Sequence, residues 1–327
     1  MKKLIFAGAL LALFLGCESI IQRPVPSYLF SFKDFPGLEQ IRNTQGCAIN
    51  KGYFFSLQDG GWCNVFDLRI LKPVAQFPLA SQGKQNHANV AFFGPDRYDD
   101  SDKFPLLYVS QCKSKPVTEI GLPLTDSLSR LLFVERILTD ETGVPFGSEL
   151  VQIISYEPSQ WNSRLWAADS GDPSHIWCYG NTTGNEAPGN HIVLQKFDLP
   201  EFTPDKFLVE LRDSNVLESL NFDDLLPRSS RGPQNAIIQG AFINEGILFL
   251  PCGVGSEKHP NEFFYAGLPG TRYEGRYGHF DFTDVMACEP EDLDIWEGQL
   301  YCPCNTDTAG CVYSLPYRDF VRAMMRK

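Results

Sequence analysis

Four carboxylates and two cysteines crowd one short stretch near the C-terminus, ACEPEDLDIWEGQLYCPC (residues 287–304). The acids are Glu289, Glu291, Asp292 and Asp294, and the thiols are Cys302 and Cys304. Paired carboxylates can act as general acid and base in glycoside cleavage, and carboxylates or thiolates can ligate metal ions. The fold itself can also require such a cluster. Whether the cluster serves catalysis, metal binding or the fold depends on the strands and turns that position these side chains.

The same stretch is one copy of an internal repeat. The copies are QGCAINKGYFFSL (45–57), QGAFINEGILFLP (239–251) and EDLDIWEGQLYCP (291–303). The first two share Gln, Gly, Ile, Asn, Gly and Phe without a gap, and the third keeps Ile, Gly and an aromatic residue in register. Each copy predicts a strand, a two-residue X-Gly turn and a second strand, because glycine readily adopts the positive φ of hairpin turns. A third strand follows a glycine-containing loop, so the unit is a four-stranded antiparallel meander.

Two divergent copies lie between these, at 86–156 and at 162–212, and the later one ends with the predicted strand FLVELR (207–212). No long helical period interrupts the units, although 214–228 could hold a short helix or a connecting loop. The sequence therefore predicts an all-β fold, a β-propeller of five four-stranded blades. Six blades are the alternative, because the span 162–234 is long enough to hide one.

The last unit lacks a fourth strand after CVYSLPY, and the N-terminal segment SYLFSF (27–32) offers a spare one. Pairing of that strand with the last unit would close the ring and remove exposed sheet edges. We therefore expect the propeller domain to span 27–317, followed by a basic, partly apolar tail at 318–327.

The N-terminus has the features of an export signal. Lys2 and Lys3 precede the apolar run LIFAGALLALFLG, which is short for a membrane span but suits a secretory signal. The run ends at Cys17 and resembles the lipobox of bacterial lipoproteins, with Phe14 in place of the usual leucine three positions before the cysteine. The resemblance implies a signal peptide at 1–17, lipidation of Cys17, and a tether at 18–26. Ordinary cleavage or an unprocessed cysteine is the alternative.

Removal of residues 1–17 takes away two lysines and no acids, so the formal charge changes from -12 to -14. A chain this acidic is unsuited to nucleic acid or to a second, electrostatic anchor on anionic lipid, and its partners are expected to be neutral or cationic. We expect a monomer in the bacterial cell envelope, exported and held by its lipid on the periplasmic or cell-surface face.

Three short motifs resemble a known family. HANVAFF, FPLLYVS and EPEDLDIWEGQLY are similar to segments of the five-bladed propellers of secreted bacterial and phage-tail proteins, which are related to a teichoic-acid-associated propeller. In that family the last blades carry EPE followed by a hydrophobic strand. The resemblance extends loosely over 27–317 and implies a propeller that binds or interacts with other molecules.

The repeat also indicates which side chains share the centre of the ring. Gln45, Gln239 and Glu291 occupy one equivalent position near the start of the inner strand. The counterpart in the second unit is His87 or Asn89, and in the third it is Gln160 or Asn162. These groups either converge on a ligand, such as a glycan or a peptide, or bind only ordered water and backbone. The candidate ligand-binding residues are Gln45, His87, Asn89, Gln239 and Glu291.

No residue is assigned a catalytic role. The alternative function is a carbohydrate-active hydrolase or lyase that uses Glu289 or Glu291, with His87 as a partner from another blade. Pro290 between the two glutamates favours a strand that is only beginning. Other acids, at Asp59, Asp169 and Asp172, follow strands or lie in loops, where turn formation explains them equally well.

No metal or cofactor is expected. DRYDDSD (96–102) lacks the central glycine and distal glutamate of a calcium loop, and a solvated loop explains it better. Cys302, Cys304 and Cys311, with Cys288, could form a zinc site or a Cys304–Cys311 hairpin disulfide. Because Cys304 aligns with Cys252 in the repeat, packing between blades is favoured. Most of the cysteines are interpreted as small buried apolar residues.

Overall fold

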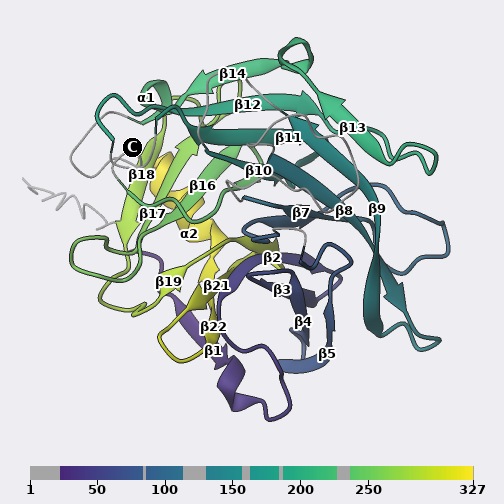
Figure 1. The fold of residues 1–327 in the computed structure, drawn as a ribbon. Helices are drawn as coiled ribbons and strands as arrows, with labels where there is room; N and C mark the ends of the chain where they lie inside the picture. The colour runs from purple at the N-terminus through teal and green to yellow at the C-terminus, as the bar shows by residue number, and fades with distance from the viewer. Residues whose placement is uncertain are drawn as a thin grey trace, which may run out of the picture.

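The computed structural model describes residues 23–83, 86–112, 130–156, 163–183, 187–226 and 236–326. The lipidation candidate Cys17 and most of the tether lie outside these residues, as do Gln160 and Asn162. Strands dominate the described part of the chain, and they form consecutive antiparallel meanders that follow one another around a common centre (Figure 1). The fold is a β-propeller.

The first two meanders are close to the sequence prediction. Meander 1 contains β2 (Thr44–Asn50), β3 (Tyr53–Gln58), β4 (Trp62–Asp67) and β5 (Lys72–Pro78). Meander 2 contains β6 (Ala91–Phe93), β7 (Leu107–Ser110), β8 (Arg130–Thr139) and β9 (Pro145–Tyr156), with β13 (Leu208–Leu211) added along β9.

The next two meanders form one continuous sheet. Meander 3 contains β10 (Ser163–Asp169), β11 (Asp172–Asn181), β12 (Ile192–Asp198) and β14 (Glu218–Asn221). Meander 4 contains β15 (Phe242–Asn244), β16 (Ile247–Cys252), β17 (Glu262–Gly267) and β18 (Tyr277–Asp281). A single parallel pair, Asp169 with Ile243, joins the two.

Meander 5 combines both ends of the described chain. It contains β19 (Glu289–Pro290), β20 (Asp294–Trp296), β21 (Gln299–Asn305), β22 (Gly310–Pro316) and the N-terminal strand β1 (Ser27–Ser31). β1 pairs antiparallel with β22, from Ser27 opposite Ser314 to Ser31 opposite Cys311. The N-terminal strand therefore occupies the outer edge of the last meander.

One strand of the sequence prediction has a different partner in the structure. FLVELR was expected as the fourth strand of the third unit, but β13 within it pairs parallel with β9 of meander 2. The fourth strand of meander 3 is β14, which lies in the segment expected to be a helix or loop and precedes the short helix α1 (Phe222–Leu225). Apolar alternation predicts that a segment is a strand but does not specify which sheet edge it joins.

The X-Gly turns have the predicted geometry. Both central residues have positive φ in each of the three repeats, as at Lys51 and Gly52 (49° and 78°) and at Glu297 and Gly298 (47° and 73°). This is the backbone of a type I′ hairpin turn, whose twist matches that of the flanking strands.

Each strand with two apolar faces contributes to two cores, one on either side of its meander. Phe55 of β3 packs with meander 2, while its neighbour Phe54 packs with Tyr301 and Val312 of meander 5. Three further clusters lie between meanders 2 and 3, 3 and 4, and 4 and 5. Because successive residues of a strand point to opposite faces, a sheet buried on both sides needs such continuous apolar runs.

Short helices complete the fold. The 3-10 helices are η1 (Phe32–Asp34) and η2 (Asp213–Asn215). Helix α2 (Tyr317–Met325) follows β22, and its Phe320 ring lies 5.3 Å from Phe249 of β16. Within the described residues, no helix has both the length and the apolar character needed to cross a bilayer.

Candidate functional site

The innermost strands are β2, β6, β10, β15 and β20. β2 contacts β6 and β20, and β10 contacts β6 and β15. We call the face of the ring from which the chain enters these strands the start face, and the face at which the strands end the end face. The five candidate ligand-binding residues lie toward the start face. Of the four acids at 289–294, Glu289 and Glu291 lie toward the start face, Asp292 lies near the centre of the ring, and Asp294 lies toward the end face.

Asp292 joins three meanders near the centre of the ring. Its Oδ2 accepts the backbone N–H of Cys47 at 2.9 Å and that of Ala91 at 3.2 Å, and the side chain is fully buried. Its Oδ1 has no protein partner. Burial raises the pKa of Asp292 well above its ordinary value, although the two N–H groups oppose this.

The repeat explains why there is room for Asp292. Gly46 and Gly240 occupy the equivalent position in the sister copies. A Cβ on Gly240 would lie 3.0 Å from the Cα and 3.2 Å from Oδ1 of Asp292. One copy therefore carries a carboxylate, and the glycine of a facing copy leaves the space that it fills.

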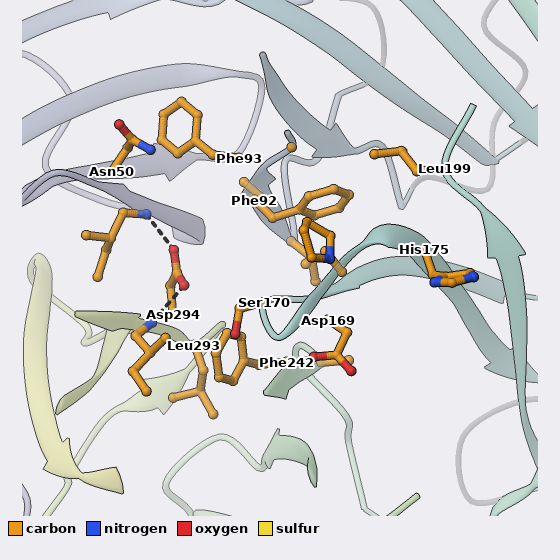
Figure 2. A pocket seen from close by; sticks show the side chains of 18 residues that line it. Asn50, Phe92, Phe93, Asp169, Ser170, His175, Leu199, Phe242, Leu293 and Asp294 are labelled. Atoms are coloured by element: carbon orange, nitrogen blue, oxygen red, sulfur yellow. Dashed lines mark hydrogen bonds between the residues drawn. The ribbon is translucent and has the colours of Figure 1, made fainter. Parts of the chain in front are cut away.

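Asp294 makes a second link between the last and first meanders. Its Oδ2 accepts the N–H of Ile49 at 2.5 Å and its Oδ1 accepts the N–H of Ile295 at 2.7 Å (Figure 2). Burial raises the pKa of Asp294 to about 7. Asp292 and Asp294 thus bond backbone groups of a neighbouring inner strand, a role that the fold requires and that does not depend on any reaction.

Glu291 is also almost fully buried, at 1% exposed. Asn305 donates through Nδ2 to Glu291 Oε1 at 2.5 Å and to the carbonyl oxygen of Thr44 at 2.7 Å. Burial, followed by the charge of Glu289, raises the pKa of Glu291 well above its ordinary value. Sequence reasoning did not identify Asn305, because it lies on β21 and outside the aligned repeat.

Glu289 is the more accessible of the two glutamates. Gln239 Nε2 donates to Glu289 Oε1 at 2.5 Å and to the carbonyl oxygen of Gly253 at 3.1 Å. Burial raises the pKa of Glu289, while the bond from Gln239 and the charge of His87 lower it. Glu289 lines an open cavity of about 670 Å³. The other lining residues are Arg42, Asn43, Val254, Gly255, Ala287, Cys288, Asn305, Thr306, Asp307 and Thr308.

His87 pairs with Asp59, an acid for which turn formation was an equally good explanation from the sequence. His87 Nδ1 lies 2.8 Å from Asp59 Oδ1, and both side chains are about one-third exposed, at 29% and 35%. The charge of Asp59 contributes to the raised pKa of Glu291, and the charge of His87 acts on Glu289. Groups from meander 1, the start of meander 2 and meander 5 are therefore close enough to influence one another electrostatically.

The remaining members of the predicted ring bond each other. Asn89 Nδ2 donates to Gln45 Oε1 at 3.3 Å, and both residues are buried. The structure thus brings the five candidate ligand-binding residues into one region. Gln45 and Asn89 bond each other, whereas His87, Gln239 and Glu291 bond residues that were not candidates for ligand binding. That they bind a ligand stays a prediction.

The end face has a smaller and more enclosed cavity, of about 200 Å³ (Figure 2). Every meander contributes to its lining. Its polar groups include Asn50, Asp169, Ser170, His175 and Asp294, and its apolar walls include Ile49, Phe92, Phe93, Leu199, Phe242 and Leu293. The sequence prediction missed this cavity. A signal existed in the repeat, where the lining residues Phe242 and Asp294 occupy one equivalent position.

The cysteines serve mainly as core residues, as the sequence indicated. Eight of the nine described cysteines are buried. Cys302 Sγ lies 3.7 Å from Cys304 Sγ, and Cys304 is directly opposite Cys311 in the sheet, yet Cys288, Cys302, Cys304 and Cys311 are all free thiols. The hairpin disulfide considered from the sequence is therefore absent. Within the described residues, no three His, Cys, Asp or Glu side chains are grouped to hold a metal ion.

Comparison with solved structures finds similar chains at low sequence identity. It is similar to the tail fiber of Staphylococcus aureus phage P68, with a TM-score of 0.51 and 12% identity over 93% of this chain and 56% of the tail-fiber chain. It is also similar to the Myxococcus xanthus glutaminyl cyclase, with a TM-score of 0.44 and 13% identity over 89% and 96% of the two chains.

A further similar structure is the β-propeller domain of Cps50 (Swd1) from Myceliophteria thermophila, with a TM-score of 0.36 and 8% identity over 83% of each chain. No protein-family model and no curated protein matches the sequence. At these identities the likeness concerns the fold alone.

Proposed function

We propose that this chain is an exported, lipid-anchored binding module, a five-bladed propeller that takes a glycan or a peptide at its start face. The five meanders correspond to five blades in this proposal, and β1 closes the ring on β22. Two observations support closure. β1 is hydrogen-bonded to β22, and an apolar cluster with Phe54, Phe66, Tyr301 and Val312 lies between the first and last meanders. Export and the lipid anchor are supported by the sequence around Cys17.

The cavity at Glu289 carries the ligand proposal. Its lining offers a guanidinium, carboxylates, amides and hydroxyls, from Arg42, Glu289, Asn305 and Thr306 among others. A polyhydroxyl ligand or a peptide backbone can exchange hydrogen bonds with such groups, whereas an apolar ligand would leave them unpaired. Glu289 links this cavity to the predicted ring through its bond with Gln239.

Binding on glycan and peptide arrays tests this proposal, with the full chain compared with Glu289→Gln. We expect a ligand retained by the full chain and weakened about tenfold or more in Glu289→Gln, because a charge-assisted hydrogen bond is lost. Glu201→Gln is the matched control, since Glu201 is exposed and does not line the cavity. Binding that is equal in all three proteins would place the ligand elsewhere.

A second function is favoured by the same residues. A glutamate with a raised pKa is suited to donate a proton, and the His87–Asp59 pair, from other meanders, is suited to accept one from water. Glu289 would then protonate the leaving oxygen of a glycoside while His87 activates the water. Release of product from a bound glycan, abolished in both Glu289→Gln and His87→Asn, would favour this hydrolase, whereas retention without turnover would favour the binding module.

A further inference from the structure

We propose that the cavity at the end face is a second binding site, distinct from the start face, and that it takes a small primary amine with an apolar body. The proposal goes beyond the proposed function and does not depend on it. It rests on the shape of the cavity, on its aromatic walls, and on two carboxylates that make no ion pair with the described residues.

The cavity is assembled by the ring as a whole. Ile49, Phe93, Asp169, Phe242 and Asp294 come from the five different meanders, each at or near the end of an inner strand. Its volume of about 200 Å³ suits a molecule of amino-acid side-chain size. Ligand sites are commonly concave, largely apolar and furnished with a few fixed polar groups, and this cavity has that composition.

Aromatic rings form the walls and are held in place by their neighbours. The Phe92 ring stacks on Tyr108 with centroids 5.1 Å apart, and the Phe93 ring lies 5.1 Å from Phe55 in an edge-on arrangement. Phe242 is 6% exposed and stands between Asp294 and Asp169 in the view of Figure 2. Aromatic faces attract cations as well as apolar groups, so these walls are compatible with both parts of an amphipathic amine.

Two carboxylates supply negative charge to the same space. Asp294 accepts one backbone N–H at each oxygen, and Asp169 accepts the N–H of Gly171 at 2.9 Å through Oδ1. A carboxylate oxygen has two lone pairs, so both side chains keep capacity for further donors. Burial raises the pKa of both groups, although backbone N–H groups and, for Asp169, the charge of Lys196 oppose the shift.

The basic side chains near the cavity are engaged by other acids. His175 Nδ1 lies 2.8 Å from Asp172 and its Nε2 lies 3.4 Å from Asp198, while Lys196 Nζ lies 3.4 Å from Asp172. Within the described part of the chain, no Lys or Arg lines the cavity. An ammonium group would supply the missing charge and donate N–H bonds to the carboxylates, whereas a neutral alcohol of the same shape would not.

Isothermal titration calorimetry at pH 8 tests the site with benzylamine and benzyl alcohol as probes of matched shape. We expect the full chain to bind one equivalent of benzylamine at least tenfold more tightly than benzyl alcohol. Asp169→Asn and Asp294→Asn should each weaken the affinity for benzylamine by about tenfold or more. Glu201→Gln should not, because Glu201 is exposed and does not line the cavity.

Asp169→Asn is the decisive variant, because Asp294 also bonds the backbone of β2 and its substitution affects stability. Thermal melting of each variant separates loss of fold from loss of binding. Equal affinity for the two probes, unchanged binding in Asp169→Asn, or no binding to the full chain would each overturn the proposal. Glu289→Gln should leave benzylamine binding intact, so failure of the amine-site proposal can be distinguished from failure of the glycan or peptide proposal.

Discussion

The two faces of the ring arise from the same repeat but have opposite character. At the start face, polar side chains bond one another in pairs, and Glu289 and Asn305 among them line an open cavity of about 670 Å³. At the end face, aromatic walls enclose about 200 Å³ around Asp169 and Asp294. The repeat fixes the path of the inner strands, whereas the chemistry at each end depends on substitutions within single copies.

The four acids at residues 289–294 differ in the same way. Asp292 and Asp294 bond backbone N–H groups of neighbouring inner strands, while Glu289 and Glu291 bond side-chain amides at the start face. Four acids within six residues therefore have two separate roles, linking the meanders and lining a polar face. Mutations that remove each role should have effects of different size and kind.

The largest effect is expected for Asp292→Ala. The substitution leaves the buried N–H groups of Cys47 and Ala91 without an acceptor and opens a cavity, so the free energy of unfolding should fall by about 3 to 5 kcal/mol. Asp292→Asn keeps an acceptor oxygen and should cost about 1 kcal/mol. Glu289→Ala at the partly exposed start face should cost under about 1 kcal/mol. Urea denaturation measures all three, and similar losses would mean that Asp292 does not link the meanders.

The second effect concerns pH. The pKa of Asp294 is about 7 in the folded protein, above the value of an exposed aspartate, so the folded state binds more protons between about pH 4 and pH 7. Stability contributed by this group is fully present at low pH and is lost as the pH rises through about 7. Glu291 and Asp292, whose pKa values are also raised, act in the same direction.

Urea denaturation at pH 5, 6, 7 and 8 checks this expectation. The free energy of unfolding should decrease across the series, and Asp294→Asn should make the decrease smaller, because its side chain does not titrate. Glu201→Gln is the control for an exposed carboxylate. A steeper or unchanged slope in Asp294→Asn would contradict a raised pKa at the end face.

The smallest effect is expected in the hairpin turns that follow the inner strands at the end face. Gly298 has φ of 73° and open space around it, so Gly298→Ala should cost about 1 kcal/mol through backbone strain alone. Gly52→Ala should cost more, because a Cβ there would lie 3.0 Å from the Trp296 ring. Thermal melting ranks the two variants, and the reverse order would show that packing at Trp296 tolerates the added methyl group.

Features that depend on neighbouring residues could be predicted from the sequence. The X-Gly turns were correct because positive φ at Lys51–Gly52 and its two counterparts is a local requirement. The strands of the first two meanders were also correct, since alternation and apolar runs are properties of short segments. FLVELR was correctly predicted to be a strand, but its partner was wrong, because the alternation of Leu208 to Leu211 is compatible with any free sheet edge.

The candidate site was likewise predicted from the sequence only in part. Alignment of the repeat placed Gln45, Gln239 and Glu291 in one region, because equivalent positions on equivalent strands lie at the same height in the ring. It did not identify Asp59 as the partner of His87 or Asn305 as the partner of Glu291, since Asp59 and Asn305 lie outside the aligned positions. The end-face cavity was missed although part of its lining lies in the aligned copies, because the rest comes from segments outside them.

The sequence by itself determined an all-β chain of repeated meanders, the positions of its tight turns, and the inner strands on which its acids lie, because these follow from local backbone preference and the two-residue period of strands. Only the tertiary structure decided what each acid does. Glu289 faces an open cavity, Asp292 fills the space left by Gly240, and Asp294 bonds Ile49, because burial and hydrogen-bond partners are supplied by segments far away in the chain.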